Sequence, residues 1–314
     1  MKKVAFVFPG QGSQEVGMGK AFYEQNATIQ QRVQEAEEAL QVPIRQLMFE
    51  GPQEELTRTE NAQPALFLTS AVVADLLKEN GIEPVMVAGH SLGEYSALYS
   101  AGSLSLTEGV KLVQSRGRLM EEAYPSGKGA MAAVLGLDEA DIEEVAASIS
   151  EQGEAVDVAN FNCPGQIVIS GTKQGVELAI EQLKEKGAKR VIPLNVSGPF
   201  HSRLMKPASE KFQAVLNDIT ISPANVPVYA NVTAEPTKDP GEISDLLVKQ
   251  IFSPVRFSET IQKMIDEDVD AIVEVGNGKV LSGLVRKVNR RMKTFAVQDP
   301  ESLEQFLAWY KEDS

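Results

Sequence analysis

The sequence predicts an α/β protein in which a large domain carries a smaller, inserted subdomain. Strand and helix signals alternate along most of the chain, as is typical of α/β domains. The middle of the chain instead shows the order βαββαβ, which is that of a ferredoxin-like unit. With 314 residues, the chain is also long for one compact core. We therefore expect the large domain at 1–127 and 198–314, and the subdomain at 128–197.

The elements of the large domain are short apolar strands with helices between them. Its strands are expected at residues 3–8, 85–88, 226–231, 269–275 and 294–297. Its clearest helices are expected at 64–79, 94–100 and 105–122. Gly81 suits the end of the first helix, and the spacing of Ser105 and Glu108 is that of a capping box.

The expected subdomain has enough elements for a small core of its own. Its strands are expected at 130–135, 156–160, 166–170 and 190–194. Its helices are expected at 139–148 and 172–186, and the second of these has a strongly amphipathic pattern.

Composition and charge exclude several classes of protein. Apolar residues form 43% and charged residues 24% of the chain, which is ordinary for a globular protein. Lys and Arg number 30 against 44 Asp and Glu, so the net charge of −14 disfavours binding to nucleic acid or to an anionic membrane. No apolar run is long enough for a membrane helix. Cys163 is the single cysteine and cannot form an internal disulfide, which predicts a cytoplasmic location.

The sequence Gly-His-Ser-Leu-Gly at residues 89–93 matches the G-x-S-x-G nucleophile elbow. A predicted strand precedes it and a predicted helix follows it, which is the context that an elbow requires. Such a turn exposes Ser91 Oγ and directs the N–H of Leu92 to the place where an oxyanion forms. The alternative is a strand–turn–helix junction that contains a serine by chance.

A serine nucleophile needs a base, and the chain has only two histidines. His90 adjoins Ser91, and on a tight turn its side chain should point away from the serine. His201 lies in a loop marked by Gly-Pro at 198–199, which favours it as the base over an ordinary surface histidine. No Asp or Glu stands out as the third member of a triad.

The segment Phe-Pro-Gly-Gln-Gly-Ser-Gln at residues 8–14 begins like a dinucleotide-binding loop. Glu15 stands where the third glycine should be, which disfavours this interpretation. The alternative is a flexible loop in which the N–H of Gln11 is the second oxyanion donor.

Arg116 lies on the apolar face of the helix predicted at 105–122, together with Val113 and Met120. An arginine that faces the interior needs an anion. One interpretation is an ion pair with an internal carboxylate, and the other is a clamp for a substrate carboxylate.

Five cations lie within eight residues near the C-terminus: Arg286, Lys287, Arg290, Arg291 and Lys293. They form either a solvated helix end or a docking patch for an acidic partner. Cys163 is interpreted as a loop or packing residue rather than a second nucleophile.

Together these motifs resemble the malonyl-CoA:acyl carrier protein transacylases of bacterial fatty-acid synthesis. The resemblance is carried by segments in the order of that family, at residues 8–14, 89–94, 116, 198–201 and 250–255. It implies a hydrolase-like α/β domain with an inserted ferredoxin-like subdomain, and malonyl transfer by a ping-pong mechanism. Its implied substrates are malonyl-CoA and the carrier protein, with no cofactor and no metal.

The resemblance also implies a role for each residue at the site. Ser91 carries the acyl group, His201 is the base, and Arg116 binds the malonyl carboxylate. Two N–H groups form the oxyanion hole, those of Gln11 and Leu92. The backbone carbonyl of Gln250 orients the histidine, which would explain the missing acid.

Two other classes of function stay open from the residues alone. A serine esterase or thioesterase would use the same elbow and histidine. A non-catalytic acyl-carrier scaffold would keep the fold, although the retained site residues oppose this. Within the family, an enzyme of polyketide synthesis is a further alternative.

Overall fold

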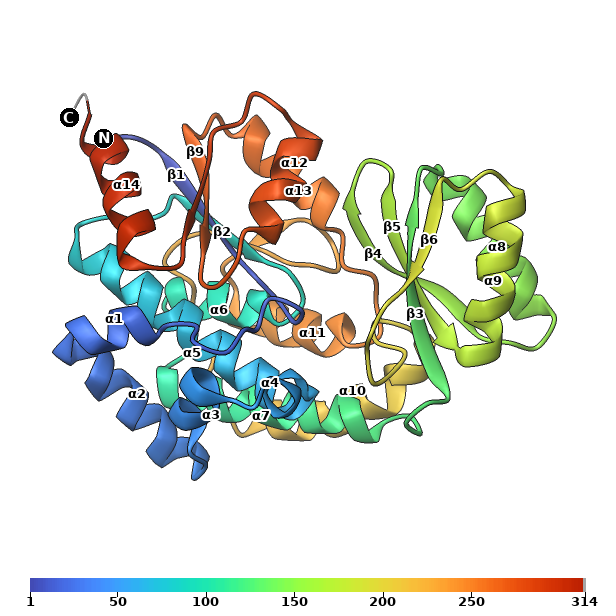
Figure 1. Cartoon of the computed structure of the whole chain (residues 1–314), viewed down its shortest axis with the longest axis horizontal. Coiled ribbons are helices and arrows are strands. Elements are labelled where there is room, and N and C mark those ends of the chain that lie inside the picture. Colours follow the sequence, from blue (N-terminus) through green and yellow to red (C-terminus); the bar gives the residue numbers. More distant parts are fainter. Residues whose placement is uncertain (313–314) are drawn as a thin grey trace.

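The computed structural model describes residues 1–312 and contains two β-sheets, each with its own helices (Figure 1). The larger sheet and most helices form one end of the molecule, and the smaller sheet with α8 (Glu139–Glu151) and α9 (Lys173–Glu185) forms the other. Residues near the two ends of the chain meet on the larger part, where Lys2 donates a hydrogen bond to the carbonyl of Glu312. None of the helices in residues 1–312 is long and apolar enough to cross a membrane.

The larger sheet has six strands in the order β10-β9-β1-β2-β7-β8. All neighbours are parallel except β7 and β8 at one edge. The strands are β1 (Val4–Phe8), β2 (Met86–Gly89), β7 (Val228–Tyr229), β8 (Pro236–Thr237), β9 (Ala271–Val275) and β10 (Thr294–Val297). The structure therefore has the mixed, mainly parallel sheet of an α/β protein.

Strand β1 explains why the sheet carries helices on both faces. Val4, Phe6 and Phe8 join the core that includes α5 (Thr59–Glu79). Ala5 and Val7 instead pack with α12 (Phe257–Asp266) and α13 (Val280–Val288). Alternate residues of a strand point to opposite faces, so a strand that is apolar throughout must be covered on both sides.

Most helices of the larger part precede β2 or follow the smaller sheet. The helices before β2 are α1 (Lys20–Gln25), α2 (Ala27–Leu40), α3 (Ile44–Glu50), α4 (Gln53–Thr57) and α5 (Thr59–Glu79). After β2 come α6 (Gly93–Ser100) and α7 (Leu106–Glu122). The rest are the 3-10 turn η1 (Arg203–Met205), α10 (Lys206–Asn217), α11 (Pro240–Gln250), α12 (Phe257–Asp266), α13 (Val280–Val288) and α14 (Pro300–Lys311).

The smaller sheet is antiparallel and has the strand order β4-β5-β3-β6. Its elements follow one another as β3 (Gly129–Leu135), α8 (Glu139–Glu151), β4 (Val156–Cys163), β5 (Gln166–Thr172), α9 (Lys173–Glu185) and β6 (Arg190–Pro193). Ala132 and Val134 of β3 pack against the two helices. Met131 and Ala133 point the other way, toward the larger part of the molecule.

Two features of the helices differ from the sequence expectation. Helix α5 begins at Thr59 rather than at Pro64, so one extra turn precedes the proline. The four helices between residues 20 and 57 were not anticipated, and three of them have seven residues or fewer. Short helices are stabilised mainly by the packing of an apolar side, which their sequences alone do not show.

Candidate active site

Ser91 lies in the sharp turn between β2 and α6. Its φ of +50° is in the left-handed region, which is strained for a residue with a side chain. The two glycines of the motif allow this turn: a Cβ on Gly89 would overlap the backbone of Gly93, and one on Gly93 would overlap the carbonyl of Phe8. The turn is therefore a strand–elbow–helix junction with the serine at its apex.

The side chain of Ser91 meets that of His201. Ser91 Oγ and His201 Nε2 are 2.8 Å apart, although the two residues are 110 positions apart in the sequence. The other ring nitrogen of His201, Nδ1, lies 2.8 Å from the backbone carbonyl oxygen of Gln250. Gln250 ends α11, where carbonyl groups lack partners inside the helix, so this oxygen can accept the Nδ1–H in addition to a long contact from the N–H of Ser253 at 3.5 Å. The tautomer with its proton on Nδ1 leaves Nε2 as the acceptor that faces the serine.

Burial keeps His201 neutral. The side chain is only 4% exposed, and this burial, together with the positive charge of Arg116, lowers the pKa of His201 to about 3. A neutral imidazole is the form that accepts a proton from a serine hydroxyl.

Arg116 is buried next to the same serine. Its Nη2 donates to Ser91 Oγ at 3.1 Å and to Gln250 Oε1 at 3.0 Å, while Nη1 donates to Gln63 Oε1 at 2.8 Å. All these acceptors are neutral, and no ion pair in residues 1–312 includes Arg116. The guanidinium also lies over the ring of Tyr95, 5.3 Å from its centroid. Within residues 1–312, no carboxylate therefore contacts Arg116 as an ion pair.

Three polar residues of the site were not singled out from the sequence: Gln63, Glu94 and Asn231. Gln63 lies on the extra first turn of α5, before Pro64. Asn231 Oδ1 accepts from the N–H of Ser91 at 2.8 Å, and its Nδ2 donates to the carbonyl of Gly89. A polar residue just after a parallel strand was the available signal for Asn231, because ligands bind at that end of such sheets.

The two expected oxyanion donors belong to different segments: Leu92 follows Ser91 directly, and Gln11 lines the same cavity as Ser91. Leu92 is the N-cap residue of α6, where N–H groups have no partner inside the helix. Gln11 follows β1, and its side chain is fixed by a hydrogen bond from Nε2 to Thr59 Oγ1 at 3.0 Å. A Cβ on Gly10 would overlap the carbonyl of His90, so this glycine lets the Gln11 loop approach the elbow closely.

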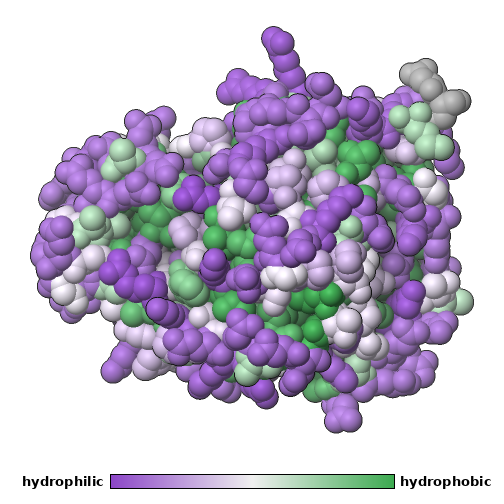
Figure 2. Space-filling model, turned by 180° about the vertical axis from the view of Figure 1, so that it is seen from behind, coloured by the Kyte–Doolittle hydropathy of each residue, from purple (hydrophilic) through white to green (hydrophobic). Residues whose placement is uncertain are grey.

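Ser91 and His201 line a cavity of about 350 Å³ between the two sheets. One wall consists of residues 10–14, and the opposite wall of cleft-facing residues of the smaller sheet. These wall residues of the smaller sheet are Met131, Ala133, Asn160, Asn162, Gln166 and Val168. Seen from behind, polar residues cover most of the molecule, and apolar residues show in patches in the middle of this face (Figure 2).

His90 points away from Ser91, toward the smaller sheet. Its Nε2 lies 2.7 Å from Asn162 Oδ1 and 3.3 Å from Asn160 Nδ2, and its ring packs against Phe257. Cys163 is buried at the end of β4, where burial raises the pKa of its thiol. A raised pKa leaves little reactive thiolate at Cys163. We therefore assign no role at the serine to His90, whose ring points away from it, or to Cys163.

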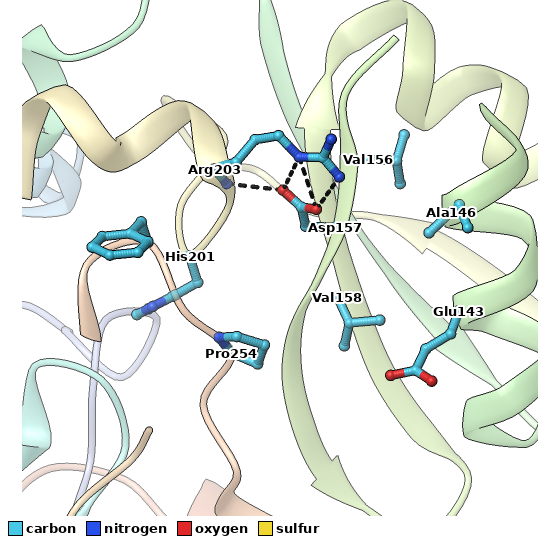
Figure 3. A pocket seen from close by; sticks show the side chains of 10 residues that line it. Glu143, Ala146, Val156, Asp157, Val158, His201, Arg203 and Pro254 are labelled. Carbon is cyan, nitrogen blue, oxygen red and sulfur yellow. Dashed lines mark hydrogen bonds and ion pairs between the residues drawn. The ribbon is translucent and has the colours of Figure 1, made fainter. Parts of the chain in front are cut away.

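A second cavity, of about 390 Å³, lies on the other side of the His201 loop (Figure 3). Arg203 and Asp157 form an ion pair there, with the Arg203 side chain and N–H both donating to the carboxylate. This contact ties the loop that carries His201 to strand β4 of the smaller sheet.

The five C-terminal cations are all exposed: Arg286, Lys287, Arg290, Arg291 and Lys293. Two of them lie at the end of α13, whose Val280, Leu281 and Leu284 line the cavity of Ser91. Lys287 reaches the rim, with Nζ 3.4 Å from Gln166 Oε1. Within residues 1–312, no group of three or more His, Cys, Asp or Glu side chains is arranged to hold a metal ion.

Comparisons with known proteins agree with this architecture. The family model for the acyl transferase domain matches residues 5–301. The chain is 55% identical over 314 residues to the malonyl CoA-acyl carrier protein transacylase of Bacillus subtilis, covering 100% of this chain and 99% of the relative. It is 44% identical over 313 residues to the protein of the same name from Staphylococcus aureus, with both chains fully covered.

Solved structures give the same result. An acyl carrier protein S-malonyltransferase from Vibrio cholerae superposes with a TM-score of 0.94 at 43% identity, covering 97% of this chain and 99% of the other. A malonyl-transacylase in complex with a type II PKS acyl-carrier protein superposes with a TM-score of 0.95 at 40% identity, covering 98% and 99%.

Because the acyl transferase model matches almost the whole chain, the protein is an acyltransferase. High identity over the full length narrows this class further. The chain belongs to the family of malonyl CoA-acyl carrier protein transacylases.

Proposed function

We propose that this protein transfers the malonyl group from malonyl-CoA to the phosphopantetheine thiol of acyl carrier protein, through a malonyl ester of Ser91. The proposal rests on the two contacts made by the hydroxyl oxygen of Ser91. Ser91 Oγ lies 2.8 Å from the buried, neutral His201 and 3.1 Å from the buried cation Arg116. A base and a carboxylate-binding group therefore converge on one nucleophile.

In the first half of the reaction, Ser91 Oγ attacks the thioester carbonyl while His201 Nε2 takes the hydroxyl proton. The tetrahedral oxyanion is held by the N–H groups of Gln11 and Leu92. The Gln250 carbonyl holds the imidazole by Nδ1 and stabilises the imidazolium that forms. His201 then protonates the departing sulfur, so CoA leaves as the thiol.

In the second half, the carrier's thiol attacks the malonyl ester, and the same groups act in reverse order. His201 accepts the thiol proton and returns it to Ser91 Oγ as the ester bond breaks. No step needs a bound cofactor or a metal, and we propose that the enzyme uses neither. The lone Cys163 supports a cytoplasmic location.

Arg116 selects the malonyl group. A single methylene separates the malonyl carboxylate from the carbonyl that Ser91 attacks, so the group that binds this carboxylate must lie beside the nucleophile. Arg116 meets this requirement, and its Nε has no hydrogen-bond partner in residues 1–312. A planar guanidinium binds a carboxylate with two parallel hydrogen bonds and fixed geometry.

The smaller sheet and the cations beside it complete the proposal. We expect residues 128–197 to act as a subdomain that narrows the cleft and excludes water, which favours transfer over hydrolysis. We expect the acidic carrier protein to bind at the basic run, which consists of Arg286, Lys287, Arg290, Arg291 and Lys293. The position of α13 supports this docking site, because α13 lines the cavity of Ser91 and also carries the first two cations.

Incubation with malonyl-CoA, with and without carrier protein, tests this function against a hydrolase. A transferase consumes malonyl-CoA rapidly only when carrier protein is present, and the malonyl group appears on the carrier. Rapid release of free malonate without carrier would instead indicate a thioesterase.

A further inference from the structure

A buried carboxylate lies behind Arg116 and is not used by the mechanism above. Glu94 follows Ser91 by three residues on α6 and is only 3% exposed. Burying a charged group is costly unless hydrogen bonds or an opposite charge compensate it. The position of Glu94 in the site therefore needs an explanation.

The side-chain amide of Gln250 connects Glu94 to Arg116. Gln250 Nε2 donates to Glu94 Oε2 at 2.7 Å, and Gln250 Oε1 accepts from Arg116 Nη2 at 3.0 Å. An ionised carboxylate only accepts hydrogen bonds, so Glu94 determines which end of the amide faces the guanidinium. The cation and the carboxylate thus share one neutral bridge.

Glu94 is also tied to the elbow through Asn231. The N–H of Asn231 donates to Glu94 Oε2 at 3.1 Å, and Asn231 Oδ1 accepts from the N–H of Ser91 at 2.8 Å. Both bridging residues are buried, with Asn231 1% and Gln250 0% exposed. The network has little contact with water, so a change of charge within it is weakly screened.

The charged and titratable groups that act on Glu94 are few. Arg116 of α7 attracts its charge, while Asn231 after β7 and Gln250 of α11 are neutral amides. Tyr95, the next residue on α6, stays neutral because burial raises the pKa of its hydroxyl. The two histidines beside Ser91 are neutral as well, since burial lowers the pKa of both His90 and His201.

We propose that Glu94 is a positioning residue that balances the charge of Arg116 in the empty site and takes up a proton when a malonyl carboxylate binds to Arg116. The inference rests on the proposed role of Arg116. Without substrate, ionised Glu94 supplies a negative charge that faces the buried guanidinium through Gln250. With malonyl bound, two carboxylates would share one cation, and the protonation of Glu94 from solvent removes the surplus charge.

The uptake of a proton by Glu94 on binding determines how the KM for malonyl-CoA depends on pH. Burial raises the pKa of Glu94 to about 7 in the empty site. Below that pH Glu94 is already protonated, and malonyl binds without competition; above it, binding must draw a proton from solvent. The KM for malonyl-CoA should therefore rise as the pH rises above 7. The rise is about tenfold for each unit by which malonyl raises the pKa of Glu94. Acetyl-CoA brings no carboxylate, so its KM should not follow this trend.

The variant Glu94→Gln separates this role from a purely structural one. The glutamine carbonyl still accepts from Gln250 and Asn231, but the charge is gone. We expect the KM for malonyl-CoA to be nearly independent of pH in this variant, and at about pH 9 to be lower than that of the wild type. A structural role predicts a higher KM at every pH, because the network would be damaged.

Asp75→Asn is the matched control. Asp75 on α5 also has a pKa raised by burial, but it accepts from Tyr99 and pairs with Arg32 at another cavity. Its replacement should leave the pH profile for malonyl-CoA unchanged.

If Glu94→Gln does not fold, the wild-type comparison of malonyl-CoA with acetyl-CoA still decides the matter. Equal pH slopes for the two thioesters would overturn the proposal, as would an unchanged malonyl slope in Glu94→Gln. If Arg116 does not bind the malonyl carboxylate, a different result is expected: Arg116→Ala would keep the preference for malonyl over acetyl.

Discussion

Nη2 of Arg116 donates a hydrogen bond to Oγ of Ser91 at 3.1 Å. This contact brings a buried positive charge to the atom that attacks the thioester. In the proposed function, the same charge binds the carboxylate of the malonyl group. Ser91 Oγ therefore contacts both the proposed base, His201, and the proposed specificity residue, Arg116.

Replacing Arg116 by alanine should remove the preference for malonyl. Losing one partner of a buried charge pair costs about 2–5 kcal/mol, which is roughly 30-fold to a few thousand-fold in kcat/KM. Acetyl transfer should hold or rise, because acetyl has no carboxylate to bind. The check is kcat/KM for both thioesters in both proteins. An equal fall for malonyl and acetyl would make Arg116 a structural residue only.

The variant His201→Ala should slow acylation by about 10²–10⁴-fold, the usual cost of losing a general base. His90 cannot take over, because its ring is turned toward Asn160 and Asn162. Rapid-quench measurement of the acyl-enzyme tests this, with His90→Asn as the variant that should retain a far larger share of the rate. Acylation at the wild-type rate in His201→Ala would exclude His201 as the base.

Acylation at saturating malonyl-CoA should change little between about pH 8 and about pH 5.5. His201 must be neutral to act, and burial lowers the pKa of His201 to about 3, so it stays neutral over this range. An exposed histidine, with a pKa near 6.5, would lose about tenfold in rate by pH 5.5. A tenfold fall centred near pH 6.5 would show that the imidazole is solvated in the working enzyme.

Reversing the charge of three cations of the basic run tests the carrier-docking surface. Arg286, Lys287 and Arg290 are exposed, and their replacement by glutamate should raise the KM for carrier protein by about tenfold or more. Its salt dependence should weaken, while the KM for malonyl-CoA moves less. The same change at Lys173, Lys184 and Lys186 around α9 serves as the control. If the KM values for carrier protein and malonyl-CoA rise equally, or if neither changes, the basic run is only a solvated helix end.

The sequence predicts the site best where one local pattern decides the structure. The glycines around Ser91 are required by backbone contacts within the motif and with β1, so the elbow is visible in five residues. Arg116 could be placed inside because the helix repeat puts it among Val113 and Met120, which are buried with it. The strand at residues 294–297 was predicted with its observed bounds, since Thr, Phe and Val favour strands.

Other parts of the site depend on contacts that no local pattern contains. Gln63 was missed because the expected helix began at Pro64, whereas tertiary packing extends α5 by one turn before the proline. Asn231 and Glu94 are separated by 137 positions, and only the pairing of β7 beside β2 brings them together. The carbonyl of Gln250 can accept from His201 because α11 ends there, and the sequence shows no clear stop signal at that residue.

Mass spectrometry of the intact protein after brief exposure to malonyl-CoA tests the central claim most directly. The wild type should gain one malonyl group, located on Ser91, and should lose it to the carrier's thiol when holo carrier protein is added. The Ser91→Ala variant should fold normally and gain no adduct. An adduct of unchanged yield in Ser91→Ala, or a wild-type adduct that carrier protein cannot remove, would contradict the account.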